Sequence, residues 1–388
     1  MTIFNKKIFW LALVLFLTLG LLAACGGDDS DDGAEESDED TTETSGDDEE
    51  GSEDDAEADG GSGDYSAEDM EEDTWRFVTE EVQGQVQYVY AEEFADRISE
   101  KSDGKITVEP YEFGGLGSET DQVDQLQQGT VEMAVMSPGF TGNMVAEGQL
   151  FALHFLFPDD LEVTQEILNN SEAINTDLRE RYEEFNISPL SFWTEGAMQW
   201  TSSGTELRTP DDFENFQMRV QTSPLIMRSY EQYGANPQEM SWGELYTALD
   251  RGTVDGQENP IFFIADASFH EVQDYMTVSN HNNYVAMTTV NTDWYDGLDD
   301  NTRAMVDETV EEMQEWVFDE QTRQNEEFLS VIEDDTDNPT EIIELTEEER
   351  DAFRQEAMEV RDYYRNEISE VGGDILDKLE GEIEEHQE

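Results

Sequence analysis

Basic residues are scarce in this chain, which has 19 Lys and Arg against 97 Asp and Glu and a formal net charge of −78. Such an excess of negative charge repels phosphate groups, and this excludes a nucleic acid as partner. A solvated acidic surface of this kind is typical of proteins that work in concentrated salt, where ions screen the self-repulsion. We therefore expect a halophilic or similarly salty setting outside the cell.

Cysteine is almost absent, because Cys25 is the single one, so no internal disulfide can form and the fold depends on packing. The cysteine follows a short basic start and the apolar run Ile8–Ala24, which has the length of a signal-peptide core. The residues "LAAC" before and at Cys25 resemble a lipobox. We expect cleavage of residues 1–24 and lipidation of Cys25, which would anchor the chain to the outer face of the cell membrane. A plain signal anchor with a chance cysteine is the alternative.

Lysine and arginine are missing altogether from the stretch Gly26–Asp73, in which about half of the residues are acidic. A segment of this composition cannot bury a core and repels itself, so it is expected to be an extended, disordered tether. The predicted organisation is therefore a signal peptide (1–24), a lipidated cysteine with its tether (25–73), and one folded region (74–388).

Catalytic signatures are missing as well. The chain has no Gly-rich phosphate loop, no GxSxG and no dinucleotide fingerprint, and acidic pairs are too frequent for any one of them to indicate acid–base catalysis. None of the four histidines has a neighbour at metal-ligand spacing. We expect no enzyme, no cofactor and no metal. The histidines are His154, His270, His281 and His386.

Strand and helix patterns alternate through the folded region. Strand-like runs at Thr74–Thr79, Lys105–Tyr111 and Val131–Met136 are separated by helical spacing, and this favours a parallel sheet covered by helices. Runs at Ser188–Gly196 and Phe216–Thr222 repeat the theme, and the last third is mainly helical. In that third, apolar residues from Met305 to Val317 form one helical stripe, and Thr346 with Glu349 predicts a capping box at a helix start. The prediction is an α/β protein with two lobes, a hinge, a cleft between the lobes and long helices that cross from one to the other. Ligands of such sheets bind beyond the carboxyl ends of the strands.

Arg219 is unusual in so acidic a chain, because it lies between Met218 and Val220 in an apolar strand-like run. Alternate residues of a strand face opposite sides, so the arginine is set apart from its two apolar neighbours. A guanidinium grips a carboxylate with two parallel hydrogen bonds, which suits the capture of an anion. A structural salt bridge to one of the many acidic residues is the alternative.

Further candidates for a binding site follow strand ends and begin helices, where a crevice between lobes would draw them together. They comprise two acids after the first strand, an amide and three aromatic rings. These residues are Glu80, Glu81, Phe140, Trp242, Asn259 and Phe263.

Four segments together resemble one family: "GGLGSETDQVDQLQQGTVEMAV", "QMRVQ", "WGELYTAL" and "GTVDGQENP" are similar to the solute receptors of TRAP transporters over about residues 74–380. The resemblance implies a receptor that closes on a small organic anion or zwitterion and presents it to a membrane permease driven by an ion gradient. It makes Arg219 the carboxylate clamp and Asn259 its polar companion. Met198 stands where many members have a second arginine, which disfavours a dianion. Asn215 replaces a glycine expected to adopt a left-handed turn.

Within that family, "TWRFVTEEVQGQVQ", "SPGFTG" and "DGQENPIFF" resemble the receptors for ectoine and hydroxyectoine, which are zwitterions. This resemblance implies that Arg219 holds the carboxylate and that Glu81, or else Glu80, faces the amidinium cation. Strand register decides which glutamate points inward. The rings of Phe140, Trp242 and Phe263 would close around the solute by cation–π attraction.

Two other functions stay open at this point. One is a receptor for another organic acid, such as a dicarboxylate, keto acid, sugar acid or amino acid, although an inward glutamate would repel a pure anion. The other is a cell-surface structural lipoprotein that has kept a receptor fold.

Overall fold

The computed structural model describes residues 65–386, which belong to one compact unit. The predicted signal peptide, the lipidation site at Cys25 and most of the predicted tether lie outside the described residues. Residues 65–73, predicted to belong to the tether, pack on the folded region: Met70 is buried, and the Tyr65 hydroxyl donates to Glu308 Oε1 at 3.0 Å. No helix in the described part of the chain combines the length and the apolar character that crossing a membrane requires.

The first sheet confirms the predicted β-α-β-α-β start, because β1 pairs in parallel with both β2 and β3. Two further strands complete the sheet. β10, from much later in the chain, is antiparallel to β3, and β4, from the middle of the chain, is antiparallel to β10. The order across the sheet is β2 (Ile106–Tyr111), β1 (Asp73–Thr79), β3 (Met133–Met136), β10 (Asn283–Asn291) and β4 (Ile187–Ala197).

The second sheet is mixed. Its central strands are β5 and β8, which are antiparallel to each other; β6 pairs in parallel with β8 and β7, and β5 is also antiparallel to β9. The order is β11 (Glu341–Glu344), β9 (Tyr275–Val278), β5 (Gln199–Ser202), β8 (Gly256–Asn259), β6 (Gln217–Val220) and β7 (Asn236–Glu239). The two sheets define the two predicted lobes.

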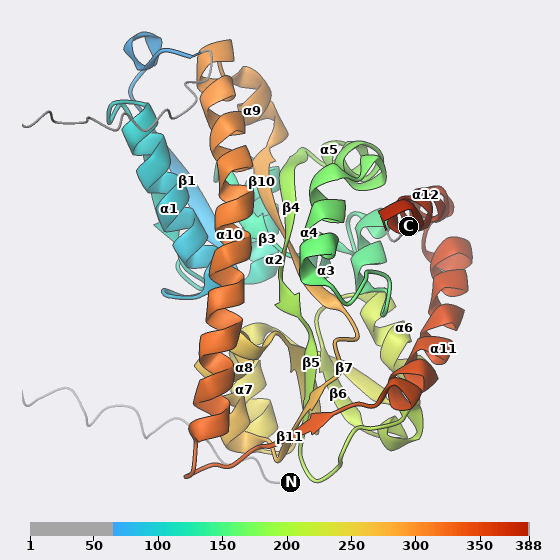
Figure 1. Cartoon of the computed structure of the whole chain (residues 1–388). Helices are drawn as coiled ribbons and strands as arrows, with labels where there is room; N and C mark the ends of the chain where they lie inside the picture. Colours follow the sequence, from blue (N-terminus) through green and yellow to red (C-terminus); the bar gives the residue numbers. More distant parts are fainter. Residues whose placement is uncertain (1–64, 387–388) are drawn as a thin grey trace, which may run out of the picture. The chain divides into compact units, whose positions relative to one another are not determined.

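Two strand crossings join the lobes. The chain passes from β4 to β5 at Met198 and returns from β9 to β10 through Ser279–Asn282. The crossings lie side by side, because Met198 N–H donates to the Asn282 carbonyl at 2.8 Å. The long helix α10 (Asp300–Asp334) runs beside both sheets (Figure 1) and contacts β4 in the first lobe and α8 in the second. The predicted hinge and crossing helix are therefore present.

The helices cover the outer faces of the sheets. On α10, the predicted apolar stripe from Met305 to Val317 is buried. Burial of each such side chain contributes about 1.5–3 kcal/mol to the stability of the fold. The capping box predicted at Thr346 and Glu349 is confirmed. The other helices are α1 (Val86–Lys101), α2 (Glu119–Gln127), α3 (Pro138–Thr141), α4 (Leu161–Asn170), α5 (Arg179–Glu183), α6 (Pro224–Gln232), α7 (Trp242–Asp250), α8 (Ile261–Asp266), α9 (Thr292–Gly297), α11 (Glu347–Tyr363) and α12 (Glu370–His386).

Gly256 allows β8 to sit in the middle of the second sheet, and its replacement should be costly. A Cβ added there would lie 2.1 Å from the Thr201 carbonyl oxygen and 2.7 Å from the Phe216 ring. We expect Gly256→Ala to lower the free energy of unfolding by about 1–3 kcal/mol in chemical denaturation. Gly297→Ala, where a Cβ meets no atom within 4 Å, is the control and should change it little. Equal stability of the two variants would contradict this packing.

Candidate functional site

A cavity lies between the two sheets, at the carboxyl ends of β1 and β3 in the first lobe and of β6 and β8 in the second. About 280 Å³ of space not filled by atoms, part of it open to solvent, lies between its walls. Its position is the one that open α/β sheets use for ligands. The lining residues are Glu80, Glu119, Phe140, Arg219, Gln221, Trp242, Asn259, Phe263 and Tyr284.

Six of the seven residues predicted for the site line this cavity, and Glu81 does not. Three lining residues escaped the sequence analysis: Glu119, Gln221 and Tyr284. The strand alternation used for Arg219 also applies to Gln221, two residues on, and was a usable signal. Glu119 and Tyr284 gave no local signal, because the first is one acid among many and the second lies on a strand paired from a distant part of the chain.

Arg219 occupies the second-lobe wall. The preceding turn is the left-handed one predicted at Asn215, whose φ is 64°. The Arg219 side chain is buried, and its Nε and Nη2 both donate to the Met240 carbonyl, at 3.1 and 3.0 Å. Within residues 65–386, no carboxylate forms an ion pair with it, so the predicted alternative of a structural salt bridge does not apply there. Burial lowers the pKa of this guanidinium, and an anion in the cavity would offset the cost of the buried charge.

Glu80 lies on the opposite wall. Its Oε2 accepts a hydrogen bond from Ser137 N–H at 2.9 Å, while its Oε1 has no hydrogen-bond partner in the described part of the chain. The side chain is 6 % exposed. Burial raises the pKa of Glu80 well above its usual range, and the nearby charge of Glu119 adds to this effect. A cationic group in the cavity would supply the partner that Oε1 lacks and would lower this pKa.

Glu81 turns away from the cavity towards Glu195 on β4. Gln87 bridges the two acids: its backbone N–H donates to Glu81 Oε2 at 2.7 Å, and its Nε2 donates to Glu195 Oε1 at 2.8 Å. Both carboxyls are buried. Burial raises the pKa of both, and for Glu81 the charge of Glu195 is the next cause; the pKa of Glu195 rises to about 7. The pair therefore holds a proton close to neutral pH.

Aromatic rings form the remaining walls. The Trp242 and Phe263 rings lie 4.9 Å apart between centroids, and Phe263 lies 5.7 Å from Tyr284. The Tyr284 hydroxyl accepts from Gln221 Nε2 at 3.3 Å, which joins the two lobes. Such rings suit a compact cation, to which each well-placed face contributes about 0.5–2 kcal/mol.

The lobes also meet through Glu119, at the start of α2. Its Oε1 accepts from the backbone N–H of Trp242 at 3.1 Å, and its Oε2 accepts from the Ser241 hydroxyl at 3.2 Å. The carboxylate thus satisfies the N-terminus of α7 in the other lobe, where a negative charge is favoured. This contact, the Glu119 clasp, holds the two walls together at one edge of the cavity.

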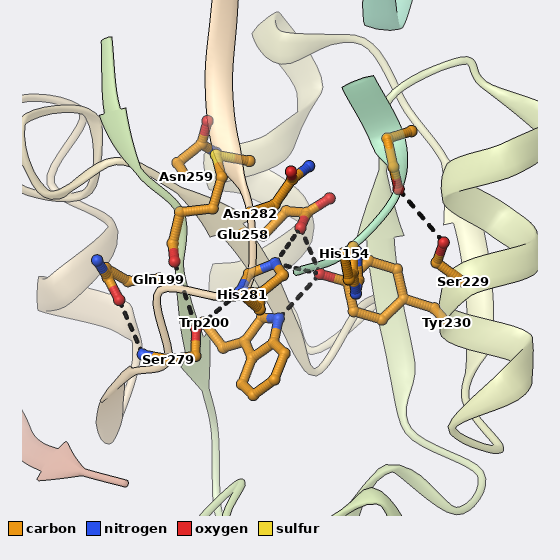
Figure 2. A network of polar contacts seen from close by, with 12 residues as sticks. His154, Gln199, Trp200, Ser229, Tyr230, Glu258, Asn259, Ser279, His281 and Asn282 are labelled. Carbon is orange, nitrogen blue, oxygen red and sulfur yellow. Dashed lines mark hydrogen bonds and ion pairs between the residues drawn. The ribbon is translucent and has the colours of Figure 1, made fainter. Parts of the chain in front are cut away.

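A second cavity, with about 400 Å³ of empty space, adjoins the first and shares Gln221 and Tyr284 with it. Its walls include Met198, the position of the missing arginine, and Glu258. Behind Glu258, the structure gathers two histidines that have no neighbour at metal-ligand spacing in the sequence (Figure 2). His154, Glu258 and His281 are buried side by side, and each offers a nitrogen or oxygen atom that could bind a metal ion. Residues so far apart in the chain leave no spacing signal.

Comparison with known proteins gives a consistent result. Residues 77–367 match the family model DctP, bacterial extracellular solute-binding protein, family 7. The ectoine-binding periplasmic protein TeaA of Halomonas elongata is 32% identical over 311 residues, which cover 80% of this chain and 90% of that protein. Its high-resolution structure superposes with a TM-score of 0.77 over 81% of this chain and 100% of that one. The C4-dicarboxylate-binding periplasmic protein DctP of Rhodobacter capsulatus is also 32% identical, over 70% of this chain and 80% of that protein.

The raised pKa of Glu195 predicts how stability changes with pH. The folded state keeps the proton up to about pH 7, whereas an unfolded glutamate releases it near its ordinary value of 4.5, so stability falls as pH rises from 4.5 to 7. Glu195→Gln removes this loss and keeps an oxygen for Gln87. We compare the free energies of unfolding of the variant and the wild type by chemical denaturation. On going from pH 5 to pH 8, the difference should shift in favour of the variant by on the order of 2–3 kcal/mol.

The control for this experiment is Glu311→Gln, which changes an exposed glutamate of α10. It should leave the pH dependence of the wild type in place. A Glu195→Gln variant whose stability follows the wild type at both pH values would mean that Glu195 is ionised throughout.

Proposed function

This chain belongs to the family of bacterial extracellular solute-binding proteins, family 7 (DctP), and from that premise we propose that its solute is a small zwitterion of the ectoine type. As a TRAP receptor it works with membrane permease components, to which it delivers the solute. We propose Arg219 as the carboxylate-binding residue and Glu80 as its counterpart for the cation, with Glu81 behind it. Asn259 supplies an amide, and Phe140, Trp242 and Phe263 supply the rings.

The observation that carries this proposal is the pair of opposite charges on facing walls. The Arg219 guanidinium is bonded only to a neutral carbonyl, and Glu80 has a carboxylate oxygen without a partner within residues 65–386. Both groups are buried, so each charge is costly until a ligand supplies its complement. A zwitterion supplies both complements at once, whereas a simple anion satisfies the guanidinium alone and leaves Glu80 Oε1 without a partner.

A receptor for another organic acid is the alternative function. The similar protein from Rhodobacter capsulatus, which binds C4-dicarboxylates, is an example of this class. Two features favour the zwitterion. The cavity wall contains two carboxylates, Glu80 and Glu119, against one guanidinium. The adjoining cavity has Met198, a neutral residue, in its wall. A second carboxylate of a ligand would find no cation among these lining residues.

The cellular location of the receptor is inferred from the sequence of the segments that lie outside the described residues. We propose that Cys25 carries the lipid that anchors the chain to the outer face of the cell membrane, and that the acidic stretch after it is a tether. The acidic composition suits a salty exterior, where compatible solutes are useful. A purely structural role on the cell surface would require no solute binding. Solute binding in the titrations below would therefore argue against such a role.

Removal of the Arg219 guanidinium should strongly weaken solute binding. Truncating one partner of a buried, hydrogen-bonded charge pair costs about 2–5 kcal/mol, so we expect Arg219→Ala to weaken ectoine binding by at least about thirtyfold. Isothermal titration calorimetry in high salt measures this, with thermal unfolding as a check that the variant is folded. Arg208→Ala removes a half-exposed arginine paired with Glu206 and should bind ectoine like the wild type. Unchanged affinity in folded Arg219→Ala would refute the proposed clamp.

The neutral substitution Glu80→Gln separates zwitterions from anions. Glutamine keeps an oxygen for Ser137 N–H but removes the charge, and a hydrogen bond to a charged group contributes about 1.5–3 kcal/mol. We expect ectoine affinity to fall about tenfold or more and succinate affinity to stay equal or rise, both measured by competition calorimetry. Tight succinate binding by the wild type, without any response to ectoine, would assign the protein to the rival class.

A further inference from the structure

His154, Glu258 and His281 come from three separate parts of the chain: the segment after the 3-10 helix Ala146–Ala152, the strand β8, and the crossing between β9 and β10. We propose that they form a binding site for one divalent transition-metal ion with the preferences of Zn²⁺. One ligand atom from each residue lies within 4.8 Å of the other two, and all three side chains are buried. This proposal is independent of the identity of the solute.

The donor set suits such an ion. Two imidazoles and one carboxylate are the ligands that zinc takes at sites with an open position, at about 2.0–2.2 Å from each atom. Hard cations such as Ca²⁺ and Mg²⁺ prefer oxygen atoms alone. His281 Nε2 and Glu258 Oε2 are 2.7 Å apart, so they have to separate by about 0.5 Å to reach the spacing of two tetrahedral ligands. A rotation of the carboxylate of Glu258, which lines a cavity, provides this movement.

The surrounding hydroxyl groups orient both rings. His281 Nδ1 is bonded to Ser279 Oγ at 2.7 Å, and His154 Nδ1 is bonded to the Tyr233 hydroxyl at 2.9 Å. In metal sites, the ring nitrogen that does not bind the ion usually has such a partner, which fixes the tautomer and the direction of the ring. Figure 2 shows the His154 and His281 rings beside the Glu258 carboxylate, with the Tyr230 hydroxyl bonded to Glu258 and to His281, the latter at 3.2 Å.

The protonation states also agree with metal binding. Burial lowers the pKa of His154 to about 3 and that of His281 well below its usual value. Both imidazoles are therefore neutral at pH 7, which is the form that binds a metal. The Glu258 carboxylate supplies one negative charge in a place where a dication would relieve its desolvation, since burial raises the pKa of Glu258.

The adjoining cavity gives the ion a path and a fourth coordination position. Glu258 forms part of the wall of the 400 Å³ cavity together with Asn282 and Asn283. The Asn283 Oδ1 has no hydrogen-bond partner in the described part of the chain. A water molecule on the metal would bring O–H donors into a cavity whose wall holds this unpaired acceptor. Because His281 lies on a lobe crossing and Glu258 precedes Asn259, the ion would tie the hinge to the strand that ends at the solute cavity.

The test uses Co²⁺ as the probe for a mixed nitrogen and oxygen site. The full chain, treated with a chelator and then dialysed into buffer with excess Mg²⁺ to occupy surface carboxylates, is titrated with Co²⁺. We expect one equivalent to bind with the strong visible absorption of four- or five-coordinate cobalt, and Zn²⁺ to displace it. A spectrum no stronger than that of six-coordinate aqueous cobalt overturns the proposal and leaves a plain hydrogen-bond network. This arm needs no variant, so folding defects cannot obscure it.

Variants then assign the ligands. His154→Gln should lose the absorption band, and Glu258→Gln should weaken cobalt binding at least tenfold. His386→Gln changes an exposed histidine of α12 and should keep the band of the wild type. Retention of the band in a folded His154→Gln variant contradicts the site. Ectoine titration of the cobalt-free protein is run separately, so a failure of the metal site and a failure of the proposed solute are told apart.

Discussion

The site depends on one buried positive charge that has no carboxylate partner within residues 65–386 of a very acidic chain. Ninety-seven acidic residues compete for nineteen basic ones, yet the guanidinium of Arg219 is bonded to the carbonyl of Met240. The strand β6 and the left-handed turn at Asn215 hold it at the wall of the cavity. The two hydrogen bonds to this carbonyl fix the side chain before the ligand arrives, which reduces the entropy lost on binding.

Much of the fold could be predicted from the sequence, because its information is local. Alternation identified β1 to β3 and β6, helical spacing identified the stripe on α10, and Thr346 with Glu349 identified a helix start. The antiparallel insertion of β10 beside β3 left no local trace, since partners in a sheet can come from any distance along the chain.

The site was less accessible to the same reasoning. Strand alternation and a family resemblance were sufficient to single out Arg219 and Asn259. The choice between Glu80 and Glu81 depended on the turn after β1, which places Glu80 at the cavity and Glu81 against Glu195. His154 and His281 come together only through tertiary contacts between segments separated by more than a hundred residues. Pairwise spacing rules cannot detect such a cluster.

The Glu119 clasp has a consequence for how affinity is set. Its two hydrogen bonds, to Trp242 N–H and to the Ser241 hydroxyl, join the lobes without any atom of a ligand. Each such bond to a charged acceptor contributes about 1.5–3 kcal/mol, so part of the closed population exists before capture. The measured dissociation constant is therefore the intrinsic one divided by that population. Substitutions in the partners of Glu119 at the start of α7 can therefore change the affinity for a scarce solute while Arg219 and Glu80 stay as they are.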